Sequence, residues 1–114
     1  MKYIGSCHCK NIEFQIETDL EKIVQCNCSI CIRRNAKMII VPKENFILIK
    51  GERDLSLYQF NSNVAKHYFC KKCGIYTHHR SYTNPENYEY NVGCIDNVDT
   101  FEYKNIPVFD GDKL

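Results

Sequence analysis

The spacing of the cysteines constrains this chain more than any other feature of its sequence. Seven of the eight cysteines fall in three clusters, "CHC" at 7–9, "CNCSIC" at 26–31 and "CKKCG" at 70–74. The start of the chain lacks the apolar core of a secretory signal, so we expect a cytoplasmic protein. In that reducing compartment, clustered cysteines are more often metal ligands than disulfides.

The "CKKCG" cluster has the spacing of a zinc knuckle. Backbone N–H groups of such a turn can point at the first sulfur, and the glycine tolerates the left-handed conformation that the turn needs. Knuckles usually come in pairs, and "CHC" offers the second pair of thiolates. We therefore expect a structural four-cysteine zinc site, with two disulfides or free buried thiols as the alternative. Its ligands would be Cys7, Cys9, Cys70 and Cys73.

The remaining cluster supplies three thiolates, from Cys26, Cys28 and Cys31, where a tetrahedral metal needs four ligands. Two accounts are possible from spacing alone. Cys94 could complete a second four-cysteine site. Alternatively, Cys94 is a core residue of the apolar stretch "YNVGCID", and the metal keeps one open position.

Length and composition indicate a single domain over residues 1–114. Hydrophobic residues make up 44% of the chain, as in ordinary globular proteins. The net charge is +1 and no run of like charges stands out, so composition points to neither nucleic acid nor an anionic membrane. No apolar stretch approaches the roughly 20 residues of a membrane helix. The oligomeric state does not follow from the sequence.

Strand patterns dominate, so we expect a mainly β fold of short antiparallel strands. Helix signals are confined to a short turn through "ICIRRN", which Ser29 could cap. The "KEN" at 43–45 is typical of a turn. The expected extended segments are 12–18, 37–42, 46–51, 56–61, 64–69, 88–95 and 101–109.

Taken in order, four segments resemble the glutathione-dependent formaldehyde-activating enzyme family, which shares its domain with centromere protein V. The segments are "GSCHCKNIEFQI", "CNCSICIRRNA", "HYFCKKCGIYTHHRS" and "NVGCID", within about residues 3–96. The resemblance implies an Mss4-like fold with a structural zinc on the first and third clusters. It implies a catalytic zinc on Cys26, Cys28 and Cys31, with Cys94 outside the ligand set and the fourth position open.

The activity that the resemblance implies is the condensation of glutathione with formaldehyde to S-hydroxymethylglutathione, a carbon–sulfur lyase reaction in reverse. We therefore expect about two zinc ions per chain, the second of them labile, and a small thiol such as glutathione as partner. A non-enzymatic zinc-binding module for protein interaction or thiol binding is the alternative. A redox switch that uses the thiolates of "CNCSIC" is a third hypothesis.

The implied chemistry suits a zinc with three thiolates, which is a weak Lewis acid but can hold a soft thiolate ligand. Arg33 and Arg34 could bind the carboxylates of such a thiol, although a solvated basic turn is the simpler interpretation. His78 and His79 would point to opposite faces of a strand, so at most one could reach the site and move a proton.

Overall fold

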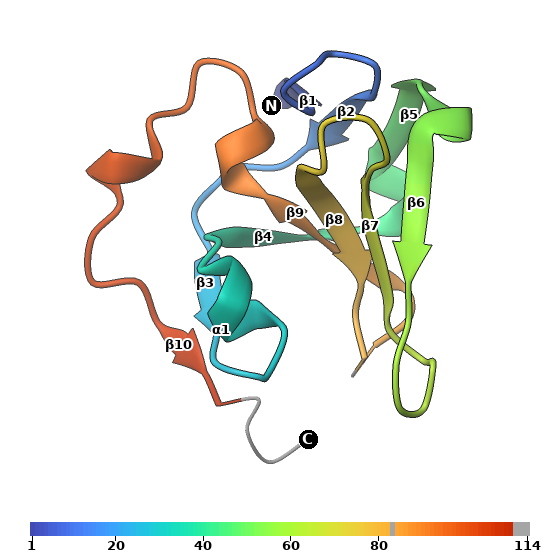
Figure 1. Ribbon diagram of the computed structural model, residues 1–114. Helices are drawn as coiled ribbons and strands as arrows, with labels where there is room; N and C mark the ends of the chain where they lie inside the picture. Colours follow the sequence, from blue (N-terminus) through green and yellow to red (C-terminus); the bar gives the residue numbers. More distant parts are fainter. Residues whose placement is uncertain (83, 111–114) are drawn as a thin grey trace.

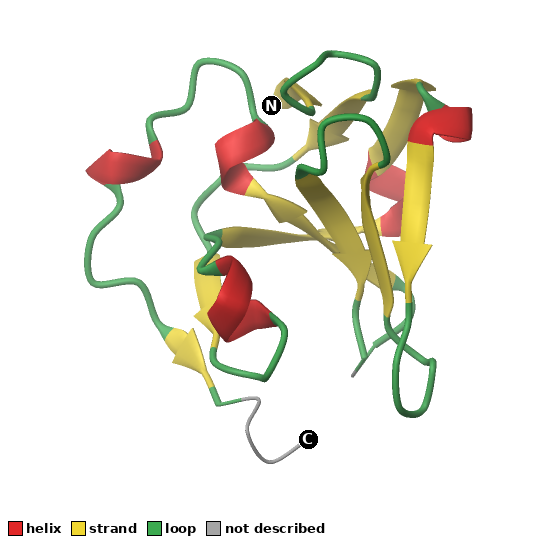
Figure 2. Ribbon diagram, in the orientation of Figure 1, coloured by secondary structure: helices red, strands yellow, loops and turns green. Residues whose placement is uncertain are grey.

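The computed structural model describes residues 1–82 and 84–110, and these form a mainly β fold, as expected. Figure 1 shows the strands and Figure 2 shows how short the helical segments between them are. The smaller sheet has the order β1-β2-β5, and its strands run antiparallel. They are β1 (Lys2–Ser6), β2 (Glu13–Glu17) and β5 (Phe46–Lys50).

The larger sheet has seven strands in the order β10-β3-β4-β9-β8-β7-β6. Every neighbouring pair is antiparallel except β10 and β3, which run parallel. The strands are β3 (Ile23–Cys26), β4 (Met38–Pro42), β6 (Leu55–Tyr58), β7 (Lys66–Cys70), β8 (Tyr76–Arg80), β9 (Asn87–Asn91) and β10 (Val108–Phe109).

The helical segments are single turns. The α-helix α1 (Cys31–Arg34) follows β3, and its N-cap is Ile30 without a side-chain cap, so the expected capping by Ser29 is wrong. The "KEN" turn is the 3-10 helix η1 (Lys43–Asn45), and η2 (Glu52–Asp54) precedes β6. Near the end of the chain lie η3 (Val92–Cys94) and η4 (Thr100–Glu102).

Alternating side chains of both sheets form one hydrophobic core. In β2, Phe14 and Ile16 are buried while their neighbours are partly exposed, and in β4 Ile39 and Val41 are buried around the exposed Ile40. Tyr90 of β9 is fully buried against the same cluster. In β2 the two-residue period of the sequence therefore matches the pleat of the strand.

Two expected strands are shorter than the sequence patterns suggested. The segment 88–95 ends as a strand at Asn91, whose side-chain oxygen accepts the N–H of Gly93 at 3.1 Å and begins η3. The segment 101–109 contains η4 and irregular chain before β10. No helix among the described residues has the length and apolar character that crossing a membrane requires.

Candidate metal centres

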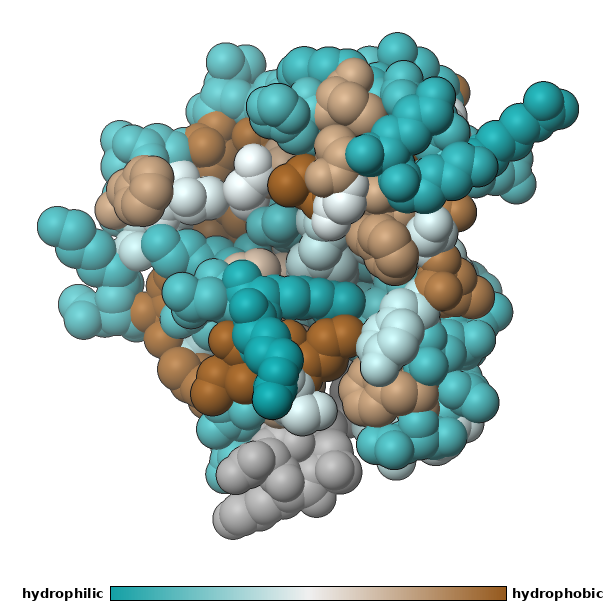
Figure 3. Space-filling model, in the orientation of Figure 1, coloured by the Kyte–Doolittle hydropathy of each residue, from teal (hydrophilic) through white to brown (hydrophobic). Residues whose placement is uncertain are grey.

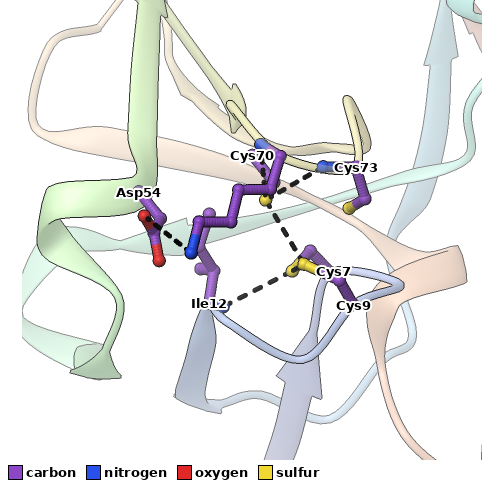
Figure 4. A network of polar contacts seen from close by, with 7 residues as sticks. Cys7, Cys9, Ile12, Asp54, Cys70 and Cys73 are labelled. Atoms are coloured by element: carbon purple, nitrogen blue, oxygen red, sulfur yellow. Dashed lines mark hydrogen bonds and ion pairs between the residues drawn. The ribbon is translucent and has the colours of Figure 1, made fainter.

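The first and third cysteine clusters meet in space, as Figure 4 shows. Cys7 follows β1 and Cys9 lies in the next turn, while Cys70 ends β7 and Cys73 lies in the turn before β8. All four sulfurs lie within 4.8 Å of one another. The Cys9 Sγ atom is 3.6 Å from the Sγ atoms of both Cys7 and Cys70.

These distances suit a tetrahedral metal rather than disulfides. A disulfide would place two sulfurs about 2.05 Å apart. Zinc–sulfur bonds of about 2.3 Å in a tetrahedron place the sulfurs about 3.8 Å apart, close to the observed 3.6 Å. Four thiolates complete such a tetrahedron, so this centre leaves no position for an exchangeable ligand.

Backbone N–H groups surround the same sulfurs, as expected for ligand thiolates. The Cys7 sulfur accepts from the N–H of Ile12 at 3.4 Å, and the Cys70 sulfur accepts from those of Lys72 and Cys73 at 3.4 and 3.5 Å. The turn closes at Gly74, whose φ is +78° and whose N–H donates to the Cys70 carbonyl at 2.8 Å. The "CKKCG" segment thus has the geometry of a knuckle.

The second cluster lies at the junction of β3 and α1. Cys26 ends β3, Cys31 begins α1, and Cys28 lies between them, with all three sulfurs within 4.8 Å of one another. The N–H of Cys28 donates to the Cys26 sulfur at 3.4 Å. No other cysteine, histidine or carboxylate of the described residues joins this group.

Crowding of these three thiols opposes their joint ionisation. Burial is the largest influence on the Cys31 thiol and raises its pKa, together with contacts to Cys28 and Cys26. Burial also raises the pKa of Cys26. At Cys28, burial is outweighed by hydrogen bonds from the Cys31 backbone and the neighbouring thiols, which lower its pKa. A bound cation would allow all three to be thiolates, so the donor set fits a soft divalent metal.

Cys94 lies in the hydrophobic core, away from the three-cysteine cluster. Its side chain is 7% exposed, and its thiol donates to the Tyr76 carbonyl at 3.6 Å. Burial raises the pKa of the Cys94 thiol to about 12, with smaller contributions from Cys7 and Cys73 of the other centre. The structure therefore places Cys94 beside the four-cysteine centre without including it in either group.

A cavity of about 510 Å³ opens beside the second cluster, and Cys26, Cys28 and Cys31 all line it. One wall comes from β3, α1 and β10, and the opposite wall comes from the β6–β7 connection and the ends of β8 and β9. In Figure 1 these two groups of elements lie on opposite sides of the lower half of the molecule. A ligand on the open position of a metal here would extend into this cavity.

Two of the polar side chains that line the cavity form a hydrogen-bonded pair. His79 of β8 lies opposite Glu89 of β9, and its Nε2 atom donates to Oε2 of Glu89 at 2.9 Å. The hydroxyl of Tyr76 donates to Nδ1 of the same ring. His79 and Glu89 line the cavity, so this pair lies beside the three cysteines. His78 points the other way, into the aromatic core against Phe14.

A third histidine, His67 of β7, also lines the cavity. Nη1 of Arg34 contacts its Nδ1 atom at 3.1 Å, and because an arginine can only donate, Nδ1 accepts and Nε2 carries the proton. Burial, followed by the charge of Arg34, lowers the pKa of His67 to about 3. The ring is therefore neutral, with a buried Nε2–H that has no hydrogen-bond partner among the residues that the structure describes.

The two arginines of α1 have other contacts. Nη1 of Arg33 donates to the carbonyl of Ser29 at 2.6 Å, and the Arg34 guanidinium lies 3.5 Å above the Tyr76 ring. Neither arginine lines the large cavity. Their assignment to substrate binding therefore stays a prediction.

Sequence reasoning did not identify Tyr76, Glu89 or His67 as residues of the site. The available signal for Glu89 is its position in "NYEYN", where one carboxylate stands between tyrosines of a strand. Its pairing with His79 depends on the register of β8 and β9, which the spacing of residues along the chain does not contain.

Comparisons with known proteins find a matching family and a similar solved structure. The family model described as glutathione-dependent formaldehyde-activating enzyme matches residues 2–109, which include all eight cysteines. The chain is also similar to the crystal structure of a Rhodobacter sphaeroides protein, with 37% sequence identity and a TM-score of 0.89. That match covers 96% of this chain and 100% of the other.

Proposed function

The chain belongs to the glutathione-dependent formaldehyde-activating enzyme family, and on this basis we propose that it is a zinc-dependent enzyme of the carbon–sulfur lyase type. Zinc on Cys7, Cys9, Cys70 and Cys73 would be structural. A second zinc on Cys26, Cys28 and Cys31 would hold a small thiol in its open position. A reducing cytoplasm, as expected from the sequence, would keep both clusters free of disulfides.

The observation that supports this proposal most directly is the difference between the two cysteine groups. The four-cysteine group can complete a tetrahedron by itself, whereas the three-cysteine group faces a cavity of about 510 Å³. A structural metal needs no access to a cavity of that size. An open coordination position beside a cavity is instead typical of a catalytic metal.

The proposed reaction joins a thiol and an aldehyde. The sulfur–carbon bond forms, the carbonyl π bond breaks, and the proton of the thiol ends on the former carbonyl oxygen, so the reaction needs no oxidant or reductant. Zinc would keep the bound thiol deprotonated at neutral pH, where a free thiol with a pKa of about 8.5 is mostly protonated. The resemblance in sequence implies glutathione and formaldehyde as the first pair to assay.

The residues of the chain would manage the proton in this reaction. His79 is held between the Tyr76 hydroxyl and the Glu89 carboxylate, and both His79 and Glu89 line the cavity. Because these two contacts occupy both ring nitrogens of His79, the Glu89 carboxylate would accept the proton from the thiol and return it to the oxygen, with His79 positioning the carboxylate. The neutral ring of His67 lines the same side of the cavity.

Exchange NMR spectroscopy of formaldehyde and glutathione tests the proposal. Zinc-loaded protein should accelerate both formation and breakdown of the adduct above the uncatalysed rates, and the Cys28→Ser variant should not. Binding of glutathione without acceleration would instead indicate a thiol-binding module. Absence of both binding and acceleration by the zinc-loaded protein would contradict the proposed chemistry.

A further inference from the structure

The cavity separates the three cysteines from the proposed proton acceptor. Figure 3 shows hydrophobic surface in the lower half of the molecule, over α1 and β10 of the wall that carries the cysteines. Glu89 lies on the opposite wall, and its side chain is 17% exposed. Because a proton acceptor must come within about 3 Å of the proton's donor, its use depends on how the two walls are held together. The helix α1 is a single turn with no buried side chain that could anchor it.

Arg34 connects the two walls from behind the cavity. It lies three residues after Cys31 in α1, so the two side chains share one face of the turn. Its Nη1 atom donates to Nδ1 of His67 on β7 at 3.1 Å, and its guanidinium lies 3.5 Å above the ring of Tyr76 on β8. Arg34 and Tyr76 also border a small space of about 10 Å³ that two of the three cysteines border. Both side chains therefore lie beside the proposed metal centre.

A β-bulge turns Tyr76 towards His79. Residues two apart in a regular strand share a face, so Tyr76 would accompany His78 into the aromatic core. The register of β7 and β8 shifts between Tyr76 and His78, however, so that Thr77 is an extra residue on β8. Tyr76 therefore reaches His79, and its hydroxyl donates to Nδ1 of that ring. Bulges that redirect a side chain in this way are common next to active sites.

The contacts that begin at Arg34 end at Glu89. His79 accepts the Tyr76 hydroxyl at Nδ1 and donates from Nε2 to Oε2 of Glu89 at 2.9 Å. The His79 ring is stacked on the Tyr76 ring at a centroid distance of 5.9 Å and packs against His67 at 5.1 Å. These contacts fix the orientation of the His79 ring. The bond from that ring uses Oε2, which leaves Oε1 of the carboxylate to take a proton.

We propose that Tyr76 and Arg34 are positioning residues, which act through His79 to hold the Glu89 carboxylate in reach of a thiol at the three-cysteine centre. The inference rests on the proposed function, in which Glu89 accepts the thiol proton and returns it to the former carbonyl oxygen. It gives Arg34 a role other than the one expected from the sequence. The guanidinium does not line the cavity, so it orients residues of the chain rather than a carboxylate of the substrate.

A double-variant cycle tests whether Tyr76 acts through Glu89. Exchange NMR spectroscopy of formaldehyde and glutathione would give kcat and KM of the zinc-loaded protein. Glu89→Gln should lower kcat by about 100-fold and Tyr76→Phe by about tenfold, with KM for glutathione changed by less than about twofold in each. Adding Tyr76→Phe to Glu89→Gln should lower kcat by less than about twofold further, because the group that Tyr76 positions is already lost.

The outcomes of the cycle separate the inference from the proposed function. A further tenfold loss in the double variant, or an unchanged kcat in either single variant, would overturn the inference, while acceleration by the unchanged protein would still support the proposed function. If the unchanged protein does not accelerate the reaction, both fail. Tyr68→Phe is the matched control, since it removes a hydroxyl from a ring that stacks on His78 and does not line the cavity. It should leave kcat and KM unchanged.

Variants of Arg34 separate positioning from binding of the substrate. Arg34→Met should lower kcat by about tenfold with little change in KM. Arg34→Lys should not restore kcat, because an ammonium group lacks the planar stacking and the paired donors of a guanidinium. A raised KM for glutathione with unchanged kcat would instead show that Arg34 binds the substrate. Loss of zinc from Arg34→Met, measured by elemental analysis, would show that it supports the metal centre. Either result would contradict the role proposed for Arg34.

Discussion

His78 and His79 are adjacent in sequence but have opposite surroundings. The His78 ring stacks on Tyr68 and Tyr90 in the core, at centroid distances of 4.8 and 5.4 Å. The His79 ring lines the cavity and pairs with Glu89. The alternation of a β-strand predicted that only one of the two could reach the site, and the structure confirms this.

The burial of His78 predicts a loss of stability in mild acid. Burial, and to a smaller extent His79, lowers the pKa of His78 from 6.5 to about 3. Between these values the unfolded chain binds more protons than the folded chain, so stability is full above pH 6.5 and falls as the pH falls. The free energy of unfolding of zinc-loaded protein, measured with urea, should be about 1 kcal/mol lower at pH 5.5 than at pH 7.5 because of His78.

The control for that measurement is His78→Phe, which keeps an aromatic ring in the same stack. Between pH 7.5 and pH 5.5, the free energy of unfolding of this variant should fall by about 1 kcal/mol less than that of the unchanged protein. Acid release of zinc affects both proteins and cancels in the comparison. An identical pH dependence of the two proteins would show that His78 is not held neutral in the folded state.

Cys28 and Cys94 are both free thiols, and their substitution should have different effects on metal content. Cys28→Ser removes one of three ligands and should abolish binding of the second zinc, so that the metal content falls from about two to about one per chain. Cys94→Ala should retain both. Elemental analysis after gel filtration measures this, with far-UV circular dichroism to show that both variants fold. Loss of metal from Cys94→Ala would place that thiol among the ligands.

At the scale of the elements, short turns hold the cysteine clusters in place and the strands in register. Gly51, between β5 and η2, has a φ of +97°, and an added Cβ atom would lie 2.2 Å from the Asn11 carbonyl oxygen. Gly74 in the knuckle has a φ of +78°, but an added Cβ atom would have no neighbour within 4 Å. Both positions favour glycine because of their positive φ. Only at Gly51 would a Cβ atom also collide with the backbone.

Alanine at each glycine should separate these two effects. Gly74→Ala should lower the free energy of unfolding by about 1 to 2 kcal/mol, the cost of the left-handed conformation. Gly51→Ala should lower it by more than about 3 kcal/mol, since the chain at Asn11 must also move. Denaturant titration of both zinc-loaded variants measures the difference. Equal costs would show that the turn after β5 can relax without strain.

The sequence predicted the strands of this fold better than their ends. The strands Glu13–Glu17, where the sequence alternates, and Met38–Pro42, where it is an apolar run, agree with the expected segments. The stretch 88–95 reads as one strand because Val92 and Ile95 are apolar, yet the side chain of Asn91 starts a 3-10 turn there. A local side-chain hydrogen bond ended the strand, and hydrophobicity does not report such bonds.

The metal ligands and the rest of the candidate site differ in how far the sequence predicts them. The cysteine groups follow from short spacings, "CHC", "CNCSIC" and "CKKCG", that are local in the chain. Glu89 and His67 reach the cavity through the pairing of β9, β8 and β7. That pairing depends on contacts between residues distant in sequence, so spacing along the chain could not identify them.

At the scale of the whole molecule, the four-cysteine centre joins the turn after β1 to the hairpin of β7 and β8, and so connects the two sheets. The three-cysteine centre connects only β3 with α1, which are neighbours in sequence. Loss of the metal from the four-cysteine centre would therefore release a long-range connection. Loss of the metal from the three-cysteine centre would release only a local turn.

Stepwise removal of metal should reveal this difference. Titration with a strong chelator should release about one zinc equivalent from the three-cysteine centre with little change in far-UV circular dichroism. The zinc of the four-cysteine centre should leave only together with a cooperative loss of β structure. A coloured metal indicator and circular dichroism followed in the same sample measure both steps. Simultaneous release of both metals with unfolding would contradict the assignment of distinct roles.

The span between Cys9 and Cys70, which are 61 residues apart, has a consequence for the synthesis of the protein. At about 5 to 20 residues per second, the ribosome needs roughly 3 to 12 seconds to add the residues that separate them. During that time Cys7 and Cys9 have no partners, while Cys26, Cys28 and Cys31 are already complete as a group. If both groups hold zinc as proposed, the ion would therefore reach the three-cysteine group first and the four-cysteine group last.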